Sequence, residues 1–207
     1  MAIPKKHAIS IKVGICLQIL LFCLASKSFA SAVGLPQSTI KYGIATQAGY
    51  YSIKDPEGTT NQTFLVQPFN LIVTDWLSNG SKYWLEAYYS SLAFDAETDS
   101  VGQEVQHMGS KLGLLYNFSA NRHWHPWAGA GVDLSYSKYA KRHLINDFGF
   151  LAKRLEDRSN ANVALLINVA AEWLASSTWQ SGLKAEYRMP LGQNLQSMTI
   201  SVYFLFR

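Results

Sequence analysis

Charged side chains at every second position are the residues of this chain whose types and spacing suggest chemistry. Residues two apart on a strand point to the same face, and several stretches place acids and bases in this way among small residues. Opposite charges gathered on one face and shielded from water are expected to be ionised and bonded to one another. The predicted network comprises Lys111, Asp133, Glu172, Lys184, Glu186 and Arg188.

A second set of residues could support catalysis. His143, Asp147 and Ser159 lie in or beside the stretch 138–160, which we interpret as a long loop. They could supply a base, an orienting group and a nucleophile, but their spacing matches no catalytic motif, and the alternative is a solvated loop. His107 is a candidate metal ligand, yet no second ligand accompanies it at a suitable spacing. We therefore expect no catalytic residue, metal or cofactor, and interpret His107 as a polar group lining an interior.

The first thirty residues have the composition of a secretory signal peptide. Three lysines precede an apolar run at residues 13–25, and Ser28-Phe29-Ala30 offers small residues at the −3 and −1 positions of a cleavage site. The run is shorter than the about 20 apolar residues that a transmembrane helix needs. We predict that residues 1–30 are a cleaved signal peptide and that residues 31–207 form one exported domain.

Removal of this segment changes the charge and the cysteine content. The segment contains four lysines and no acidic residue, so the 18 basic residues of the whole chain fall to 14, against 14 acidic ones. The exported chain is near neutral, which gives no reason to expect a nucleic-acid partner. Both cysteines, Cys16 and Cys23, lie in the segment. The exported chain therefore has no disulfide framework, thiol nucleophile or thiolate metal site.

Eight stretches of alternating apolar and polar residues indicate β-strands, because a period of two is typical of a strand. Pro68 lies inside the second stretch and predicts a bulge there, since proline cannot donate to the ladder. The facing of the second and third stretches is ambiguous, although Glu86 is expected to point inward. The stretches cover residues 40–52, 64–76, 83–94, 107–118, 126–136, 162–173, 179–189 and 200–206.

The apolar faces of these stretches predict a membrane protein. The chain offers no convincing amphipathic helix or second layer to cover them, and only helices and closed barrels satisfy every backbone group in lipid. We predict an all-β fold, an eight-stranded antiparallel up-and-down transmembrane β-barrel with an interior that side chains can fill. The residues expected to face lipid are Leu112, Leu114, Val132, Leu134, Leu165, Ile167, Val169, Leu183 and Val202.

All six tryptophans lie beside the three connections that we predict to be short turns. Aromatic rings collect where a membrane meets water, so we predict an aromatic belt at one end of the barrel. The alternative, in which the rings fill a soluble sandwich or a lipocalin-like barrel, conflicts with the charges on the opposing face. The belt comprises Trp76, Trp84, Trp124, Trp127, Trp173 and Trp179.

The register of one hairpin predicts how the lumen is closed. A turn centred on Arg122 sets Lys111 opposite Asp133, and facing residues of opposite charge lie close enough to pair. With the other charges of the network nearby, this pair would cross a narrow interior. We therefore expect the lumen to obstruct water and ions.

The stretch 138–160 has two further interpretations. Six basic residues against three acidic ones would face the phosphate-rich outer leaflet, although an exposed run of charge is more often only solvated. The spacing of four apolar residues would suit a short helix, which Gly149 would weaken; they are Leu144, Phe148, Leu151 and Leu155. Equally, the phenylalanines of this stretch could continue the fifth strand.

Short motifs resemble those of a known group. The run His125-Pro126-Trp127-Ala128-Gly129-Ala130-Gly131-Val132, which follows Tyr116-Asn117-Phe118, resembles the proline-aromatic-x-Gly-x-Gly strand opening of small OmpA/OmpW-type bacterial outer-membrane barrels. Phe206 is similar to the terminal aromatic that the barrel-assembly machinery reads in such proteins, although Arg207 follows it here. The resemblance implies a Gram-negative outer membrane, with the short turns in the periplasm and the loops outside the cell.

Two classes of function follow. The first is a non-enzymatic surface barrel with a structural or adhesive role, or a narrow channel of the kind that the OmpW resemblance suggests. The alternative is an enzyme acting on lipopolysaccharide acyl chains, since Ser159-Asn160-Ala161 resembles the serine-asparagine segment of a lipid A deacylase, with Asp157 where that family has its histidine. The expected partners are outer-membrane lipid, lipopolysaccharide and the assembly machinery, and we expect a monomer.

Overall fold

The computed structural model describes residues 40–57, 59–78, 80–118, 124–174, 179–192 and 195–207. The predicted signal peptide and the predicted turn centre at Arg122 lie outside this part of the chain. No helix within it is long and apolar enough to cross a membrane. The strands it contains are β1 (Lys41–Lys54), β2 (Thr60–Ser78), β3 (Ser81–Phe94), β4 (Gly102–Asn117), β5 (Trp124–Ile145), β6 (Leu151–Arg154), β7 (Arg158–Leu174), β8 (Trp179–Pro190) and β9 (Leu195–Phe206).

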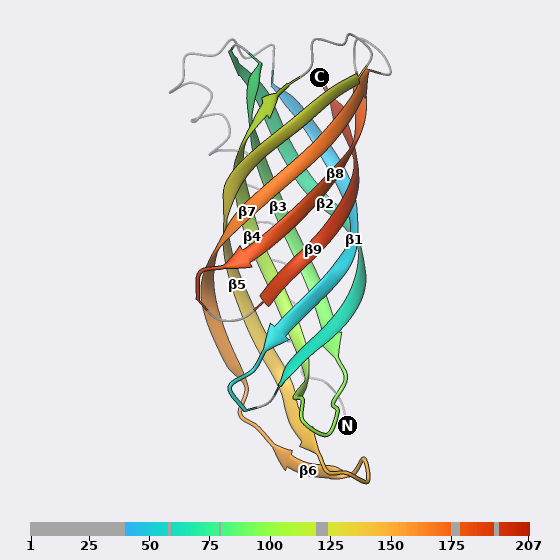
Figure 1. Cartoon of the computed structure of the whole chain (residues 1–207), viewed down its shortest axis with the longest axis vertical. Helices are drawn as coiled ribbons and strands as arrows, with labels where there is room; N and C mark the ends of the chain where they lie inside the picture. Colours follow the sequence, from blue (N-terminus) through green and yellow to red (C-terminus); the bar gives the residue numbers. More distant parts are fainter. Residues whose placement is uncertain (1–39, 58, 79, 119–123, 175–178, 193–194) are drawn as a thin grey trace, which may run out of the picture.

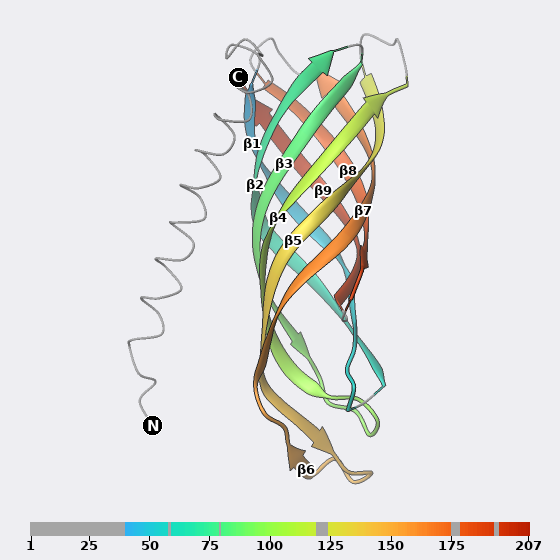
Figure 2. The same cartoon turned by 90° about the vertical axis from the view of Figure 1, so that its left-hand side faces the viewer.

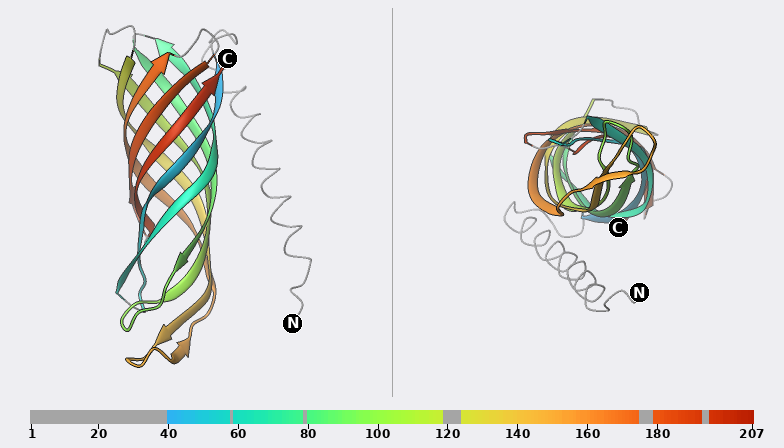
Figure 3. Two further views of the ribbon diagram at one scale, coloured as in Figure 1. Left: turned by 90° about the vertical axis from the view of Figure 1, so that its right-hand side faces the viewer. Right: turned by 90° about the horizontal axis from the view of Figure 1, so that it is seen from below.

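Eight of these strands form a closed barrel in which every pair is antiparallel, as Figures 1 and 3 show. Neighbours in the barrel are neighbours in the chain, and β1 closes the sheet by pairing with β9. The short strand β6 pairs only with the far end of β5, so it lies outside the ring. The predicted fold class is confirmed.

The two ends of the barrel differ in their connections. We call the end that carries the β2–β3, β4–β5 and β7–β8 connections the turn end, and the opposite end the loop end. At the loop end β5 and β6 form a hairpin that reaches beyond the other strands (Figure 2). The predicted long loop is therefore mostly strand, because β5 runs on to Ile145 and β7 begins at Arg158. The prediction of a short helix in this stretch is wrong, and Phe148 and Phe150 lie in the turn between β5 and β6.

Alternation along the strands separates an inner from an outer face. All nine residues predicted to face lipid are exposed on the outside, from 36% for Val132 to 59% for Leu114 and Leu134. The third strand, whose facing was ambiguous in the sequence, turns Lys82, Trp84 and Glu86 inward, and Glu86 is fully buried. The sequence pattern therefore located the lipid face correctly.

The bulge expected at Pro68 is present. Ala45 of β1 pairs with Asn70, and Gln47 pairs with Gln67, so residues 68 and 69 of β2 lie opposite the single residue Thr46. Two residues against one is the arrangement of a β-bulge. The proline therefore occupies a position at which the ladder is already interrupted.

The lumen is filled from end to end. Towards the turn end it contains the apolar cluster of Ala45, Ile72, Trp84, Leu115, Trp127, Ala170, Tyr203 and Leu205. Towards the loop end it contains a second apolar cluster, which comprises Tyr51, Ile53, Leu92, Phe94, Val105, Tyr139 and Leu195. Charged residues of β3, β4, β5, β7 and β8 lie in the remaining space.

Candidate functional site

Four charged side chains meet in the middle of the lumen and form what we call the central cluster: Glu86, Lys111, Lys184 and Glu186. Lys111 Nζ lies 3.1 Å from Glu86 Oε1 and 2.6 Å from Glu186 Oε1. Lys184 Nζ lies 3.1 Å from Glu186 Oε2 and also contacts Glu86 Oε2. Each cation therefore touches both anions, and the cluster has no net charge.

Glu86 has the most partners in the central cluster. Besides the two lysines, Asn70 Nδ2 donates to Glu86 Oε1 at 2.7 Å, and Trp84 Nε1 donates to Glu86 Oε2 at 3.0 Å. A buried charge is tolerated when its remaining hydrogen-bonding positions are satisfied in this way. Glu86 was predicted to point inward, but it was not among the residues predicted for the network.

A second group, the loop-side cluster, lies next to the central one towards the loop end. Asp133 pairs with Arg188, and the Tyr88 hydroxyl lies 2.9 Å from both Asp133 carboxylate oxygens. Arg188 Nη2 donates to Ser135 Oγ at 3.0 Å. His107 is buried beside this cluster, with Nε2 2.9 Å from the Tyr88 hydroxyl. It lines the interior, as the polar interpretation of this residue predicted.

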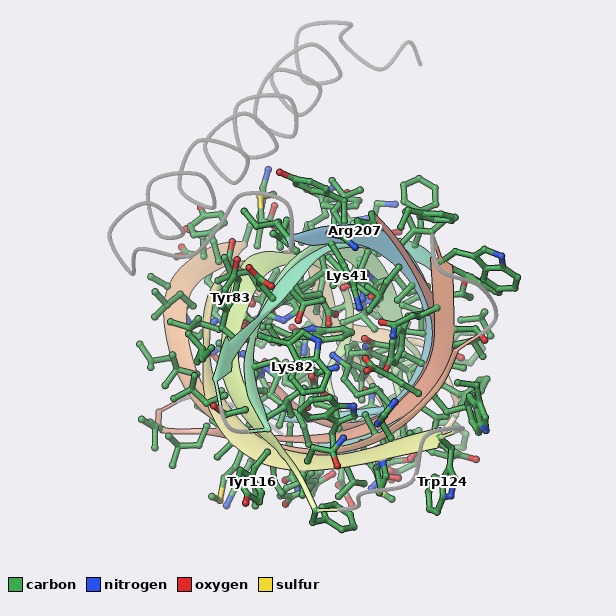
Figure 4. All side chains as sticks on the ribbon, turned by 90° about the horizontal axis from the view of Figure 1, so that it is seen from above. Lys41, Lys82, Tyr83, Tyr116, Trp124 and Arg207 are labelled. Carbon is green, nitrogen blue, oxygen red and sulfur yellow. The ribbon has the colours of Figure 1, made fainter. Side chains whose placement is uncertain are left out.

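A third group closes the lumen near the turn end. Lys82 pairs with Glu172, which also accepts a hydrogen bond of 3.0 Å from the Tyr203 hydroxyl. Lys82 Nζ lies 4.1 Å from the centre of the Trp127 ring, within the range of a cation–π contact. Figure 4 shows Lys82 pointing into the barrel, and Lys41 near the same mouth.

The predicted pairing of Lys111 with Asp133 is wrong, although the predicted register is correct. The two residues are cross-strand partners, but neither bonds to the other. Lys111 also faces Glu86 on its other neighbour, β3, and Asp133 is taken by Arg188, whose planar fork of donors matches a carboxylate. All six predicted network residues do lie in the lumen, but they are distributed over three groups.

Between the first two clusters little space remains. A cavity of about 10 Å³ is lined in part by Gln47, Tyr88, His107, Lys111 and Arg188. That volume is about what a single water molecule needs. The described lumen therefore offers no room for a column of water at this height.

The loop end is held by an ionic group that the sequence did not suggest. Asp55, in the turn after β1, accepts from Arg142 Nη2 at 2.9 Å and from Arg158 Nη2 at 2.8 Å. Glu57 also lies 2.7 Å from Arg142 Nη2. Burial raises the pKa of Asp55, but hydrogen bonds from Glu57 and the two arginine charges outweigh it and hold the pKa below its ordinary value. We call these four residues the loop-end lock.

This lock uses up part of the predicted basic excess of the stretch 138–160. Arg142 and Arg158 are bound by acids of the β1–β2 turn, and Lys141 pairs with Glu104 on β4. A phosphate-binding surface needs cations that are free of internal partners. The structure therefore weakens the basis for predicting one here.

The residues considered for catalysis do not meet. His143 Nδ1 lies 2.9 Å from the Lys141 carbonyl oxygen, and Ser159 lies opposite Lys138 in the sheet. Lys138 and His143 are five positions apart along β5, which corresponds to roughly 16 Å. Asp147 lies still farther along, in the exposed turn after β5. Among the described residues, moreover, no three of the types that bind metals are grouped.

The predicted aromatic belt is confirmed for only some of its six tryptophans. Trp124, Trp173 and Trp179 point outward at the turn end and are about two-fifths exposed, as the belt requires. Trp84 and Trp127 instead point into the lumen and are buried, because they share the phase of Glu86 and Asp133.

Trp76 also departs from the belt. It lies opposite the inward residue Lys82 at the mouth of the barrel, and its ring centre is 5.0 Å from that of Trp127. Phe206, the predicted assembly signal, is half-exposed on the outer face between Tyr42 and Trp179. Its role in assembly stays a prediction.

No family model matches the chain, and no curated protein sequence matches it. Solved structures similar to it include Neisserial surface protein A, with a TM-score of 0.50 and 13% identity over 80% of this chain and 96% of that one. Ail, the attachment invasion locus protein of Yersinia pestis, has a TM-score of 0.49 and 9% identity over 81% and 97%. The outer membrane protein OprG from Pseudomonas aeruginosa has a TM-score of 0.42 and 12% identity over 81% and 94%. The predicted resemblance to small outer-membrane barrels is confirmed at the level of the fold.

Proposed function

We propose that this chain is a non-enzymatic barrel of the Gram-negative outer membrane, a closed scaffold that carries its loop end at the cell surface. One observation carries the proposal, namely that charged and apolar side chains fill the lumen in successive layers. A solute pore needs a continuous aqueous path, which 16-stranded and larger barrels provide and an eight-stranded barrel does not. The filled lumen favours a structural or adhesive protein over a channel.

The outer face supports the membrane location. Its exposed apolar side chains would be costly in water, and three outward tryptophans at the turn end suit a membrane interface. In the proposed orientation the turns lie in the periplasm and the β5–β6 hairpin lies outside the cell. Outer-membrane lipid and lipopolysaccharide would surround the outer face, and Phe206 would serve the assembly machinery.

Single-channel recording of the refolded protein in planar lipid bilayers tests the proposal. We expect conductance far below that of a 16-stranded porin inserted in the same bilayer, because the ionic groups bridge opposite walls. A porin-like conductance would overturn the closed scaffold. A small, reproducible conductance would instead support the narrow channel, which retains the same fold.

The enzymatic alternative has a separate test. Ser159→Ala and His143→Ala should leave the acylation pattern of lipopolysaccharide unchanged, because these side chains do not form a catalytic group. Loss or transfer of acyl chains by the purified protein, abolished by Ser159→Ala, would reverse the ranking of the two functions.

A further inference from the structure

At the loop end one edge of β7 has no neighbouring strand. Every residue of β7 from Arg158 to Trp173 pairs with β5 on one side. On the other side pairing with β8 begins only at Ala164, opposite Pro190. Among the described residues, positions 158–162 therefore have a paired strand only on the β5 side, and Figure 1 shows β7 continuing past the end of β8.

The direction of the free backbone groups follows from one hydrogen bond. Leu191 N donates to the Val163 carbonyl oxygen at 2.9 Å, so the backbone groups of Val163 point towards β8. Residues two apart on a strand point their N–H and C=O groups to the same side. Ser159 and Ala161 therefore point their backbone groups to the open side, where the described part of the chain offers them no partner.

This edge lacks the features that normally protect one. Exposed edges are usually blunted by charged side chains, prolines or bulges, because they otherwise pair with other chains. The charge of Arg158 is bound to Asp55. Residues 159–162 contain no proline and no charge, and the outward side chains of Ser159 and Ala161 are small and exposed. An open cavity of about 600 Å³ lies along the edge, lined by residues 159–163, Leu191 and Gly192. A strand has both the hydrogen-bonding groups and the space it needs.

We infer that residues 158–162 are a docking edge for an extended segment of a partner protein, which adds antiparallel to β7 beyond the end of β8. Backbone hydrogen bonds to Ser159 and Ala161 would supply the affinity, as in other cases of strand addition. Lys138, the exposed neighbour of Ser159 on β5, has no ion-pair partner among the described residues. It favours an acidic side chain on the outer face of the incoming segment. The inference deepens the proposed surface role and rests on it for the accessibility of this edge.

A second copy of the chain does not fit the edge. Two copies in one membrane share the same direction along the membrane normal, and barrel strands tilt by about 35–45° from it. Two β7 strands facing each other would then cross at roughly 70–90° instead of lying side by side. Hydrocarbon does not fit either, because an open edge cannot be satisfied in lipid. The edge must therefore lie above the hydrocarbon layer.

Amide hydrogen exchange, measured by NMR on the protein in lipid nanodiscs, tests the inference. The probe is the acetylated and amidated peptide Thr-Val-Glu-Val-Thr. At a peptide concentration about ten times its Kd, exchange at Ser159 and Ala161 should slow about tenfold. Asn160 and Asn162 should not change, because their amides already face β5. The same peptide with every amide N-methylated is the matched control, and should protect none of these positions.

Two variants separate backbone from side-chain binding. Ala161→Pro removes an N–H that faces the open side and leaves the bonds to β5, so the Kd of the peptide should rise about tenfold. Ser159→Ala keeps the backbone and should bind like the wild type. If Ala161→Pro fails to fold, judged by its gel mobility, the N-methylated peptide alone decides.

Several results would overturn the inference. Slow exchange at Ser159 and Ala161 without peptide would mean that the edge is already covered. Equal protection by both peptides would mean that binding does not use the backbone. Protection by lipopolysaccharide alone, or cross-linked dimers through residues 158–162, would assign the edge to another occupant. Absence of protection by the peptide would mean that the edge binds no strand. None of these results depends on conductance, so the closed-lumen proposal can fail while this one stands.

Discussion

Replacing Glu86 with alanine tests whether the central cluster stabilises the barrel as a charge-balanced unit. Glu86 contacts both Lys111 and Lys184, and the four side chains of the cluster are at most 5% exposed. Without Glu86, both ammonium groups share Glu186, and one positive charge is left over in the lumen. Breaking a buried ion pair by removing one partner costs about 3–5 kcal/mol. We expect the free energy of unfolding to fall by about that amount.

Urea unfolding in lipid vesicles, followed by tryptophan fluorescence, measures this loss. Glu104→Ala is the control, because it removes the partner of Lys141 from a pair whose side chains are 50% and 72% exposed. Such exposed pairs contribute about 0–1 kcal/mol. Adding Lys184→Met to Glu86→Ala restores neutrality and should recover roughly 1–3 kcal/mol. Equal losses for Glu86→Ala and Glu104→Ala, or no recovery in the double variant, would refute the reasoning.

Three further predictions follow from other parts of the structure. Ile167→Arg should lower the free energy of folding into vesicles by about 2–4 kcal/mol, because the side chain is exposed near the middle of the outer face; unchanged folding would contradict the membrane assignment. The lowered pKa of Asp55 means that its stabilising contribution is present above its unfolded pKa of about 3.9 and is lost as the pH falls through the still lower folded value. The protection factors of the amides over residues 142–158, which are the exchange rates corrected for the intrinsic effect of pH, should therefore fall on acidification below that pH, and Asp55→Asn should abolish the dependence. Phe148→Cys, 83% exposed at the tip of the hairpin, should react with a membrane-impermeant maleimide on intact cells, and labelling only after lysis would reverse the proposed orientation.

The facing of most strands could be predicted because alternation is a local property. A period of two is imposed by the backbone, so Leu165, Ile167 and Val169 had to share a face whatever the rest of the fold. The same regularity fixed the register of Lys111 and Asp133 once the turn between their strands was located. The inward phase of Trp127 was also available, since it lies six residues before Asp133, but its position beside a turn favoured the belt.

Partner choice within the lumen could not be predicted in the same way. Lys184 of β8 meets Glu86 of β3 only because the closed barrel sets them across the lumen from one another. Sequence spacing says nothing about which of several inward charges a flexible lysine will reach. The loop-end lock has the same origin, because Asp55 and Arg142 belong to elements that are not neighbours in the sheet. The docking edge of β7 likewise depends on the height at which β8 ends.

The ionic groups of the lumen also determine how the chain must fold. Lys184 and Glu86 are separated by 98 residues, Lys82 and Glu172 by 90, and these partners come from opposite halves of the sequence. A hairpin formed alone would complete only part of these groups. The β3–β4 hairpin pairs Glu86 with Lys111 but lacks Lys184 and Glu186, and it leaves Lys82 without Glu172. An inward charge without its counter-ion is costly wherever water is excluded. Dominance of such distant contacts slows folding and leaves partly assembled sheets with little stability of their own. The barrel is therefore expected to form in a single cooperative step, with neutralisation of its interior coinciding with closure of the sheet.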